Sequence, residues 1–254
     1  MSWIRFPSVN LSRVLSATVV LLSCAAPTLA GDVVGEVTEP DVISSQRFAR
    51  DVNAFYLGVS AGHASGGSDE FGLRVNDGDT FAAGDLKPSG NFAGFRGGWR
   101  GILPARGGRD YVYGLEVGYD FGTLDDITSS RSGGAEVSGR SAISDVLSIR
   151  LRNGLTNRSG SVLYFVTVGY VRGDITTSGS LTDASGTSRF ESEDRRQGFS
   201  ASLGAEHKLN ENWSITGEIE YLQFESKTVE LGPSFSTKST PSYRGLRIGL
   251  NYTF

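Results

Sequence analysis

Arginine and glutamate recur at alternate positions in segments whose other positions are apolar, a spacing typical of ion pairs on one face of a sheet. The two signs nearly balance, and a guanidinium binds a carboxylate through two parallel hydrogen bonds. We expect Glu116 to contact Arg96 or Arg150 on adjoining strands, and a glutamate of 213–223 to contact Arg247. The full set of ion-pair candidates is Arg96, Glu116, Arg150, Arg152, Glu206, Glu218, Glu220 and Arg247.

Nucleophilic chemistry has one weak candidate. The tripeptide His63-Ala64-Ser65 has the His-x-Ser pattern of lipid A deacylases, but we expect it to open a flexible loop after a strand, with no fixed acid partner. His207 has no adjacent serine or cysteine nucleophile. Nucleotide-binding, thiol-redox and zinc-protease motifs are missing from the sequence. We therefore expect no catalytic residues and no enzymatic activity.

Two further motifs have alternative interpretations. Asn76-Asp77-Gly78-Asp79 could hold a divalent cation, but it lacks the spacing and closing glutamate of an EF-hand loop, and a solvated turn is the simpler interpretation. Arg172-Gly173-Asp174 has the tripeptide that integrins bind, although three residues recur by chance. We expect no bound metal and no cofactor.

The elements that position these residues are strands with a two-residue period. In 243–254, for example, Leu246, Ile248 and Leu250 share one face, while Arg247 and Asn251 share the other. Phe71, Leu73 and Val75 alternate outside the main segments and suggest that strand pairing continues there. The main alternating segments are 55–62, 91–100, 111–121, 143–153, 162–172, 199–209, 213–223 and 243–254.

Segment 143–153 places Ile143 on the apolar face with Leu147, Ile149 and Leu151. Segment 162–172 is apolar on both faces, and our choice for its outer face is the alternate set Tyr164, Val166, Val168 and Tyr170. Connections after the odd-numbered segments run to roughly 17–28 residues and those after the even-numbered ones to roughly 3–10, an asymmetry typical of outer-membrane barrels. The sequence thus predicts an all-β fold: an eight-stranded antiparallel up-and-down transmembrane β-barrel.

Alternation alone does not say which face points inward, because a soluble lipocalin-like barrel has the same period. Aromatic residues at segment ends, such as Tyr111 and Phe121, match the girdles of a membrane barrel. Glycines such as Gly94 and Gly98 fall on the charged face, where a narrow lumen needs room for long side chains. We therefore expect the apolar face to contact lipid and the charges to line the interior.

The N-terminal segment has the pattern of an export signal. Arg5 and Arg13 precede an apolar run, and Thr28-Leu29-Ala30 offers small residues for a signal peptidase, so we interpret 1–30 as a signal peptide. Lipoprotein processing at Cys24 is the alternative. Removing 1–30 would change the net charge from −4 to −6 and leave no cysteine. An acidic chain without a basic patch is not expected to bind nucleic acid.

Both ends of the expected barrel resemble a known family. Residues 53–62 and 249–254 resemble the opening and closing strands of OmpA-type outer-membrane barrels, in particular the porin-like surface antigens of alphaproteobacteria. The resemblance implies a barrel domain over 53–254 after a periplasmic lead-in over 31–52, with both termini periplasmic. It also implies that the barrel-assembly machinery reads the C-terminal signal formed by Ile248, Leu250, Tyr252 and Phe254.

The expected function follows from this architecture. We expect a structural, surface-exposed envelope protein in contact with outer-membrane lipid and lipopolysaccharide, whose external loops recognise any host or surface ligand. A narrow porin-like channel for ions or small solutes is the alternative. A lipid A-modifying enzyme is a third, weaker possibility.

Overall fold

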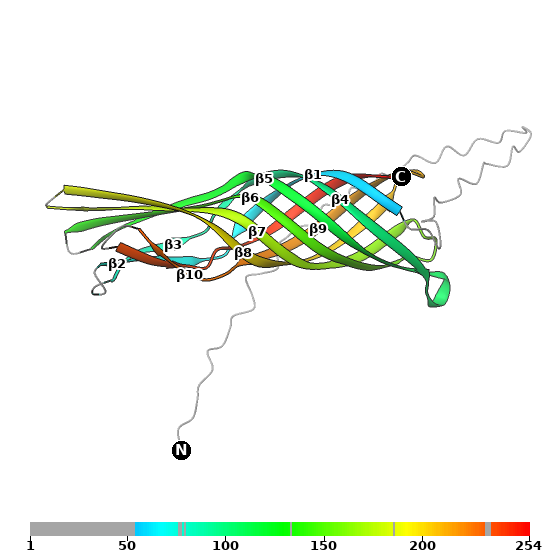
Figure 1. The fold of residues 1–254 in the computed structure, drawn as a ribbon, viewed down its shortest axis with the longest axis horizontal. Helices are drawn as coiled ribbons and strands as arrows, with labels where there is room; N and C mark the ends of the chain where they lie inside the picture. The colour runs from blue at the N-terminus through cyan, green and yellow to red at the C-terminus, as the bar shows by residue number, and fades with distance from the viewer. Residues whose placement is uncertain (1–53, 76–77, 79, 133, 185, 232–234) are drawn as a thin grey trace, which may run out of the picture. The chain divides into compact units, whose positions relative to one another are not determined.

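The computed structural model describes residues 54–254 apart from 76–77, 79, 133, 185 and 232–234 (Figure 1). The expected signal peptide over 1–30, with Cys24, and the lead-in over 31–52 lie outside the described residues. Asn76, Asp77 and Asp79 of the acidic turn lie outside them too. No helix within the described ranges is long and apolar enough to cross a membrane.

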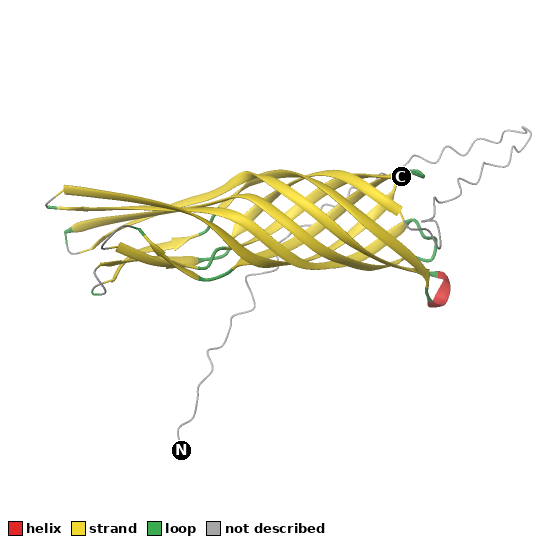
Figure 2. Cartoon of the chain, in the orientation of Figure 1, coloured by secondary structure: helices red, strands yellow, loops and turns green. Residues whose placement is uncertain are grey.

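The wall of the molecule is a closed barrel of eight strands in the order β1-β12-β9-β8-β7-β6-β5-β4, and every neighbouring pair is antiparallel (Figures 1 and 2). The predicted fold class is confirmed. The barrel strands are β1 (Ala54–Gly66), β4 (Ser89–Pro104), β5 (Asp110–Ser132), β6 (Ala135–Thr156), β7 (Val162–Asp183), β8 (Gly186–Lys208), β9 (Trp213–Phe224) and β12 (Ser242–Thr253).

Short connections gather at one end of the barrel, which we call the turn end. They comprise the β4–β5 turn with the 3-10 segment η2 (Arg106–Gly108), the β6–β7 turn and the β8–β9 turn. In the last of these, the Asn210 side chain accepts hydrogen bonds from the backbone N–H groups of Asn212 and Trp213 at 3.0 and 2.8 Å. The long connections emerge from the opposite end, which we call the hairpin end (Figure 1).

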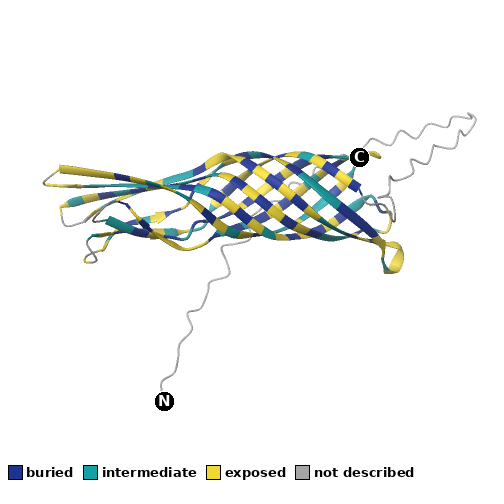
Figure 3. Ribbon diagram, viewed as in Figure 1, coloured by how far each residue is buried: buried dark blue, intermediate teal, exposed yellow. Residues whose placement is uncertain are grey.

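Along the wall, buried and exposed residues alternate in a checkerboard (Figure 3). The outward residues are large and apolar, with Phe55, Leu203 and Ile248 each more than 60% exposed. The outward face predicted for segment 162–172 is confirmed, because Tyr164 and Val168 are exposed while Leu163 is buried. The barrel thus turns its apolar side chains away from its axis.

One apolar residue was assigned to the wrong face. Ile143 is fully buried inside the barrel, whereas Leu147 of the same strand faces outward. Between them the β5–β6 register shifts at a bulge, where Asp145 and Gly122 adopt φ values of 51° and 132°. A bulge inserts one unpaired residue and so reverses the alternation beyond it. The predicted outward position of Ile143 is therefore wrong.

The connections expected to be loops are largely strands. β5 pairs with β6, and β7 with β8, as far as Ser132↔Ala135 and Asp183↔Gly186 at the hairpin tips. The first and last long connections add β2 (Asp69–Val75), β3 (Thr80–Leu86), β10 (Lys227–Glu230) and β11 (Phe235–Ser239). These four form a second sheet in the order β10-β11-β2-β3, so the predicted strand pairing around Phe71 is confirmed.

The second sheet packs on the projecting parts of the barrel hairpins. The Thr128 hydroxyl of β5 donates to the Ala83 carbonyl of β3 at 3.0 Å. An apolar core that we call the outer core lies between the two layers, and its buried members are Phe71, Leu73, Ala83, Leu86, Val137, Phe190, Val229 and Leu231. The hairpin end therefore carries a packed two-layer structure.

Candidate functional site

The barrel interior gathers the predicted charges because each sits at an inward position of its strand. Glu116 of β5 lies directly opposite Arg150 of β6, and Arg247 of β12 lies opposite Glu218 of β9. All eight predicted ion-pair residues are at most 7% exposed. A buried charge is tolerated only with partners, so their contacts determine what the interior can do.

A central cluster joins two arginines to two glutamates. The Arg96 guanidinium lies 3.1 Å from Glu116 and 3.3 Å from Glu218. Arg150 contacts Glu116 through Nε at 3.0 Å and also through Nη2, and its Nη1 lies 2.9 Å from Glu218. Both expected partners of Glu116 therefore contact it, and Glu218 completes the cluster from across the lumen.

Arg247 forms a second cluster toward the hairpin end. Its guanidinium donates to both carboxylate oxygens of Asp120, at 2.6 and 2.8 Å, and to Glu220 at 2.9 Å. It also donates to the Ser60 hydroxyl at 3.0 Å. Of the two glutamates considered for Arg247, the ion pair formed is with Glu220, whereas Glu218 contacts Arg96 and Arg150.

Glu206 forms a third cluster toward the turn end. Arg100 and Arg152 approach its two oxygens at 2.9 and 2.8 Å, and the Ser214 hydroxyl donates to it at 2.6 Å. The Arg152 guanidinium also stacks 3.6 Å from the centre of the Phe165 ring. Across the three clusters five arginines face five carboxylates, so the charges of this network sum to zero: Arg96, Arg100, Arg150, Arg152 and Arg247 with Glu116, Asp120, Glu206, Glu218 and Glu220.

Sequence reasoning missed two charged members of this network and the hydroxyl groups that contact it. Asp120 and Arg100 pair with Arg247 and Glu206, and the Tyr56 hydroxyl donates to Glu116 at 2.7 Å. The signal for Asp120 and Arg100 was present, because each has the same alternation phase as Glu116 or Arg96 on its own strand. Tyr56 has the same alternation phase as Gly58 and Ser60 on its strand, but nothing in the sequence marks its hydroxyl as a partner of Glu116.

The interior also contains apolar layers that the polar-face prediction did not include. Toward the hairpin end lies a buried cluster that we call the upper cap: Ala64, Phe92, Leu124, Ile143, Val146, Val171, Ile175, Leu222, Phe224 and Tyr243. Toward the turn end lies a smaller lower cap of Ile102, Val112, Leu163 and Phe165. The charged network therefore lies between two apolar plugs. The sequence feature that indicated these apolar layers was segment 162–172, whose residues are apolar on both faces of the strand.

Inner-face glycines make room for these side chains. A Cβ on Gly98 would lie 2.6 Å from the Tyr56 hydroxyl oxygen, and one on Gly94 would collide with the Asp120 carboxylate. At both positions a larger residue would displace a member of the network.

The remaining motifs lie in strands. His63 belongs to β1 and faces outward, so the predicted loop location is wrong; its Nδ1 lies 2.9 Å from the Asn91 amide oxygen, and that partner is not a carboxylate. The Arg172-Gly173-Asp174 tripeptide lies within β7, where Asp174 pairs with Arg195 at 2.9 Å. Within the described ranges, no group of three or more His, Cys, Asp or Glu residues could hold a metal ion.

Comparison with known protein families gives a match over residues 16–254, to the outer membrane protein beta-barrel domain. The chain belongs to this family. The 31 kDa outer-membrane immunogenic proteins of Brucella melitensis biotype 1 and Brucella suis biovar 1 are each 26% identical to it over 248 residues, covering 93% of this chain and 99% of theirs. The resemblance predicted from the terminal strands is thus confirmed, and the protein is an outer-membrane protein.

Among solved structures, OprG of Pseudomonas aeruginosa is 13% identical with a TM-score of 0.45, covering 79% of this chain and 96% of that one. Neisserial surface protein A is 13% identical with a TM-score of 0.34, covering 79% and 97%.

Proposed function

We propose that the protein is a structural outer-membrane barrel with a closed interior, which supports a surface-exposed layer and carries out no catalysis. The observation that carries this proposal is the sequence of layers along the barrel axis: an apolar cap, a neutral ion-paired network and a second apolar cap. Ions crossing such an interior would have to pass two dehydrated layers and separate paired charges. In the described part of the chain, no comparable feature supports the porin-like alternative.

Export and orientation form part of the proposal. Residues 1–30 act as the signal peptide, and the turn end, where β1 begins and β12 ends, faces the periplasm, in line with the short periplasmic turns of this kind of barrel. Both chain termini are proposed to be periplasmic. The proposed signal for the barrel-assembly machinery has the accessibility it needs, because Ile248, Leu250 and Phe254 are 65, 37 and 70% exposed on the outer wall. Tyr252 stacks edge-on against Phe254, with ring centres 5.2 Å apart.

The layer at the hairpin end would then face outward from the cell. Its outer core holds the long connections in place, so a ligand would meet a preformed surface rather than free loops. Lipopolysaccharide at its base and host or surface ligands at its tips are the proposed partners, and nucleic acid is not among them.

Planar-bilayer recording tests the closed interior. Wild-type protein refolded from detergent is expected to give no discrete conductance steps. Replacing Phe92 and Phe165 together with alanine removes one ring from each cap and is expected to introduce an ion leak, whereas Phe95→Ala, on the lipid-facing wall, is not. Discrete channels in the wild type would overturn the proposal in favour of the porin-like alternative.

A further inference from the structure

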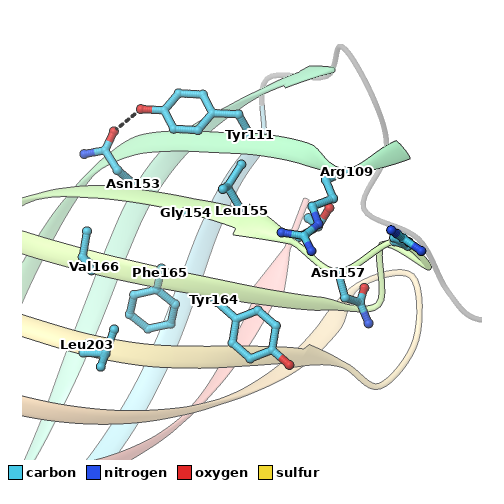
Figure 4. Close-up of a pocket in the computed structure, with 12 residues that line it drawn as sticks. Arg109, Tyr111, Asn153, Gly154, Leu155, Asn157, Tyr164, Phe165, Val166 and Leu203 are labelled. Atoms are coloured by element: carbon cyan, nitrogen blue, oxygen red, sulfur yellow. Dashed lines mark hydrogen bonds between the residues drawn. The ribbon is translucent and has the colours of Figure 1, made fainter. Parts of the chain in front are cut away.

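We propose that a groove on the outer wall at the turn end binds one phospholipid with an anionic headgroup. The groove has a volume of about 700 Å³ and runs along β6 between β5 and β7 (Figure 4). Its size lies within the range of about 300–1,000 Å³ typical of small-molecule sites. The inference relies on the proposed orientation only to assign the leaflet; binding itself does not depend on it.

The walls of the groove follow from strand register. Tyr111 of β5, Leu155 of β6 and Tyr164 of β7 are paired in one row across the three strands, and all three side chains are exposed on the outer wall. Leucine is shorter than tyrosine, so Leu155 forms a floor between two raised rings. The Tyr111 hydroxyl donates to the Asn153 amide oxygen at 2.6 Å, which fixes the position of one wall (Figure 4).

The groove continues toward the middle of the barrel with apolar residues. Val166 lies opposite Asn153 on one side and Leu203 on the other, and both apolar side chains are at least 50% exposed. This half of the groove lies on the wall that contacts hydrocarbon. An acyl chain in it would gain van der Waals contacts with the protein along its length.

The other half carries positive charge. Arg109 closes the β4–β5 turn and Arg158 lies in the β6–β7 turn, so two neighbouring turns bring their guanidinium groups to the same end of the groove. Both side chains are exposed, and none of the twelve residues lining the groove is acidic. Guanidinium groups bind phosphate oxygens through paired hydrogen bonds. An anionic headgroup at the turns and an acyl chain toward the barrel middle therefore match the groove.

Lipid titration of the refolded full chain in detergent, followed by native mass spectrometry, tests this inference. The probes are phosphatidylglycerol, phosphatidylcholine with the same acyl chains, and glycerol 3-phosphate. We expect phosphatidylglycerol to bind most tightly and glycerol 3-phosphate not to bind. Since an arginine near a membrane surface contributes about fivefold in anionic-lipid affinity, R109Q with R158Q should weaken phosphatidylglycerol binding about 25-fold and leave phosphatidylcholine unchanged.

The matched control is R106Q, which removes the same charge from the β4–β5 turn at a residue that does not line the groove. A groove-filling variant, L155W, should weaken both lipids alike. Unchanged phosphatidylglycerol binding in the R109Q/R158Q variant, an equal loss in R106Q, or binding of glycerol 3-phosphate as tight as that of the lipid would each overturn the inference. The single variants R109Q and R158Q serve if the double variant does not refold. Lipid binding is measured without conductance, so failure of the lipid-groove inference can be distinguished from failure of the closed-interior proposal.

Discussion

The middle of the barrel and the layer at its hairpin end share the strands β5 to β8 but bury opposite kinds of residue. Inside the barrel, five arginines and five carboxylates occupy the middle, and the outer wall is apolar. Inside the outer layer, the core consists of Phe71, Leu73 and their apolar neighbours. The surroundings of each region therefore decide which face is buried, because an apolar face is stable in contact with lipid but unfavourable in contact with water.

The bulge at Asp145 lies close to the point where this change occurs. On the turn side of it, β6 presents Ser148 and Arg150 to the barrel interior; on the hairpin side it presents Ile143 to the upper cap and Val137 to the outer core. Because a bulge reverses the alternation, one strand can serve the two interiors with different residue patterns.

Removing a charge from the barrel interior should have the largest effect. Glu116→Ala removes one of the two glutamates that Arg96 and Arg150 share and leaves excess positive charge buried, and breaking a buried pair in this way costs about 3–5 kcal/mol. Urea unfolding in lipid vesicles measures the loss. In a double-mutant cycle with Arg96→Ala, the two effects should not add, and strict additivity would refute the pair.

A cavity in the outer core should cost somewhat less and act locally. Leu73 is fully buried, and Leu73→Ala should destabilise the outer layer by about 2–5 kcal/mol. The expected readout is faster proteolysis within β2 and β3, with gel migration of the folded barrel unchanged. Ile127→Ala, on an exposed side chain of β5, is the control. Loss of the folded barrel band in Leu73→Ala would show that the two regions are not separable.

An arginine placed at an equally exposed position in each region tests whether lipid surrounds the barrel wall and water surrounds the outer layer. Ile219, midway along β9, and Ile127, in the projecting part of β5, are 61 and 63% exposed. Ile219→Arg places a charge in lipid and should cost about 2–4 kcal/mol. Ile127→Arg places it in water and should change the free energy of unfolding by less than about 0.5 kcal/mol. Equal effects in vesicle unfolding experiments would contradict the assignment of lipid and water.

The smallest effect is expected for an ion pair in water. Arg131 and Glu136 lie 2.7 Å apart near the β5–β6 hairpin tip, with side chains 75 and 48% exposed. Glu136→Gln should change stability by at most about 1 kcal/mol, because solvent and salt screen the pair. A loss comparable to that of Glu116→Ala would show that the hairpin tip is far less hydrated than its exposure indicates.

The barrel was predictable because a two-residue period over several residues is a strong local signal, and Glu116 and Arg150 could be placed inside on that basis. Ile143 could not, since a one-residue bulge leaves no mark on the composition. The outer layer was also missed for the most part. β10 and β11 are short and polar; β10 pairs with β11, and β11 in turn pairs with β2, more than 150 residues away in the sequence. The apolar caps depend likewise on residues from several strands that meet only in the closed barrel.

The seam between β1 and β12 has a consequence for the timing of assembly. Tyr56 pairs with Thr253 and Gly66 with Tyr243, so strands from opposite ends of the sheet complete the cylinder. Pairings so distant along the chain form slowly. Until β12 is available, β1 and β9 each have an unpaired edge whose backbone groups can pair with strands of other polypeptides. A newly exported chain would therefore need a chaperone until β12 has paired with β1 and β9.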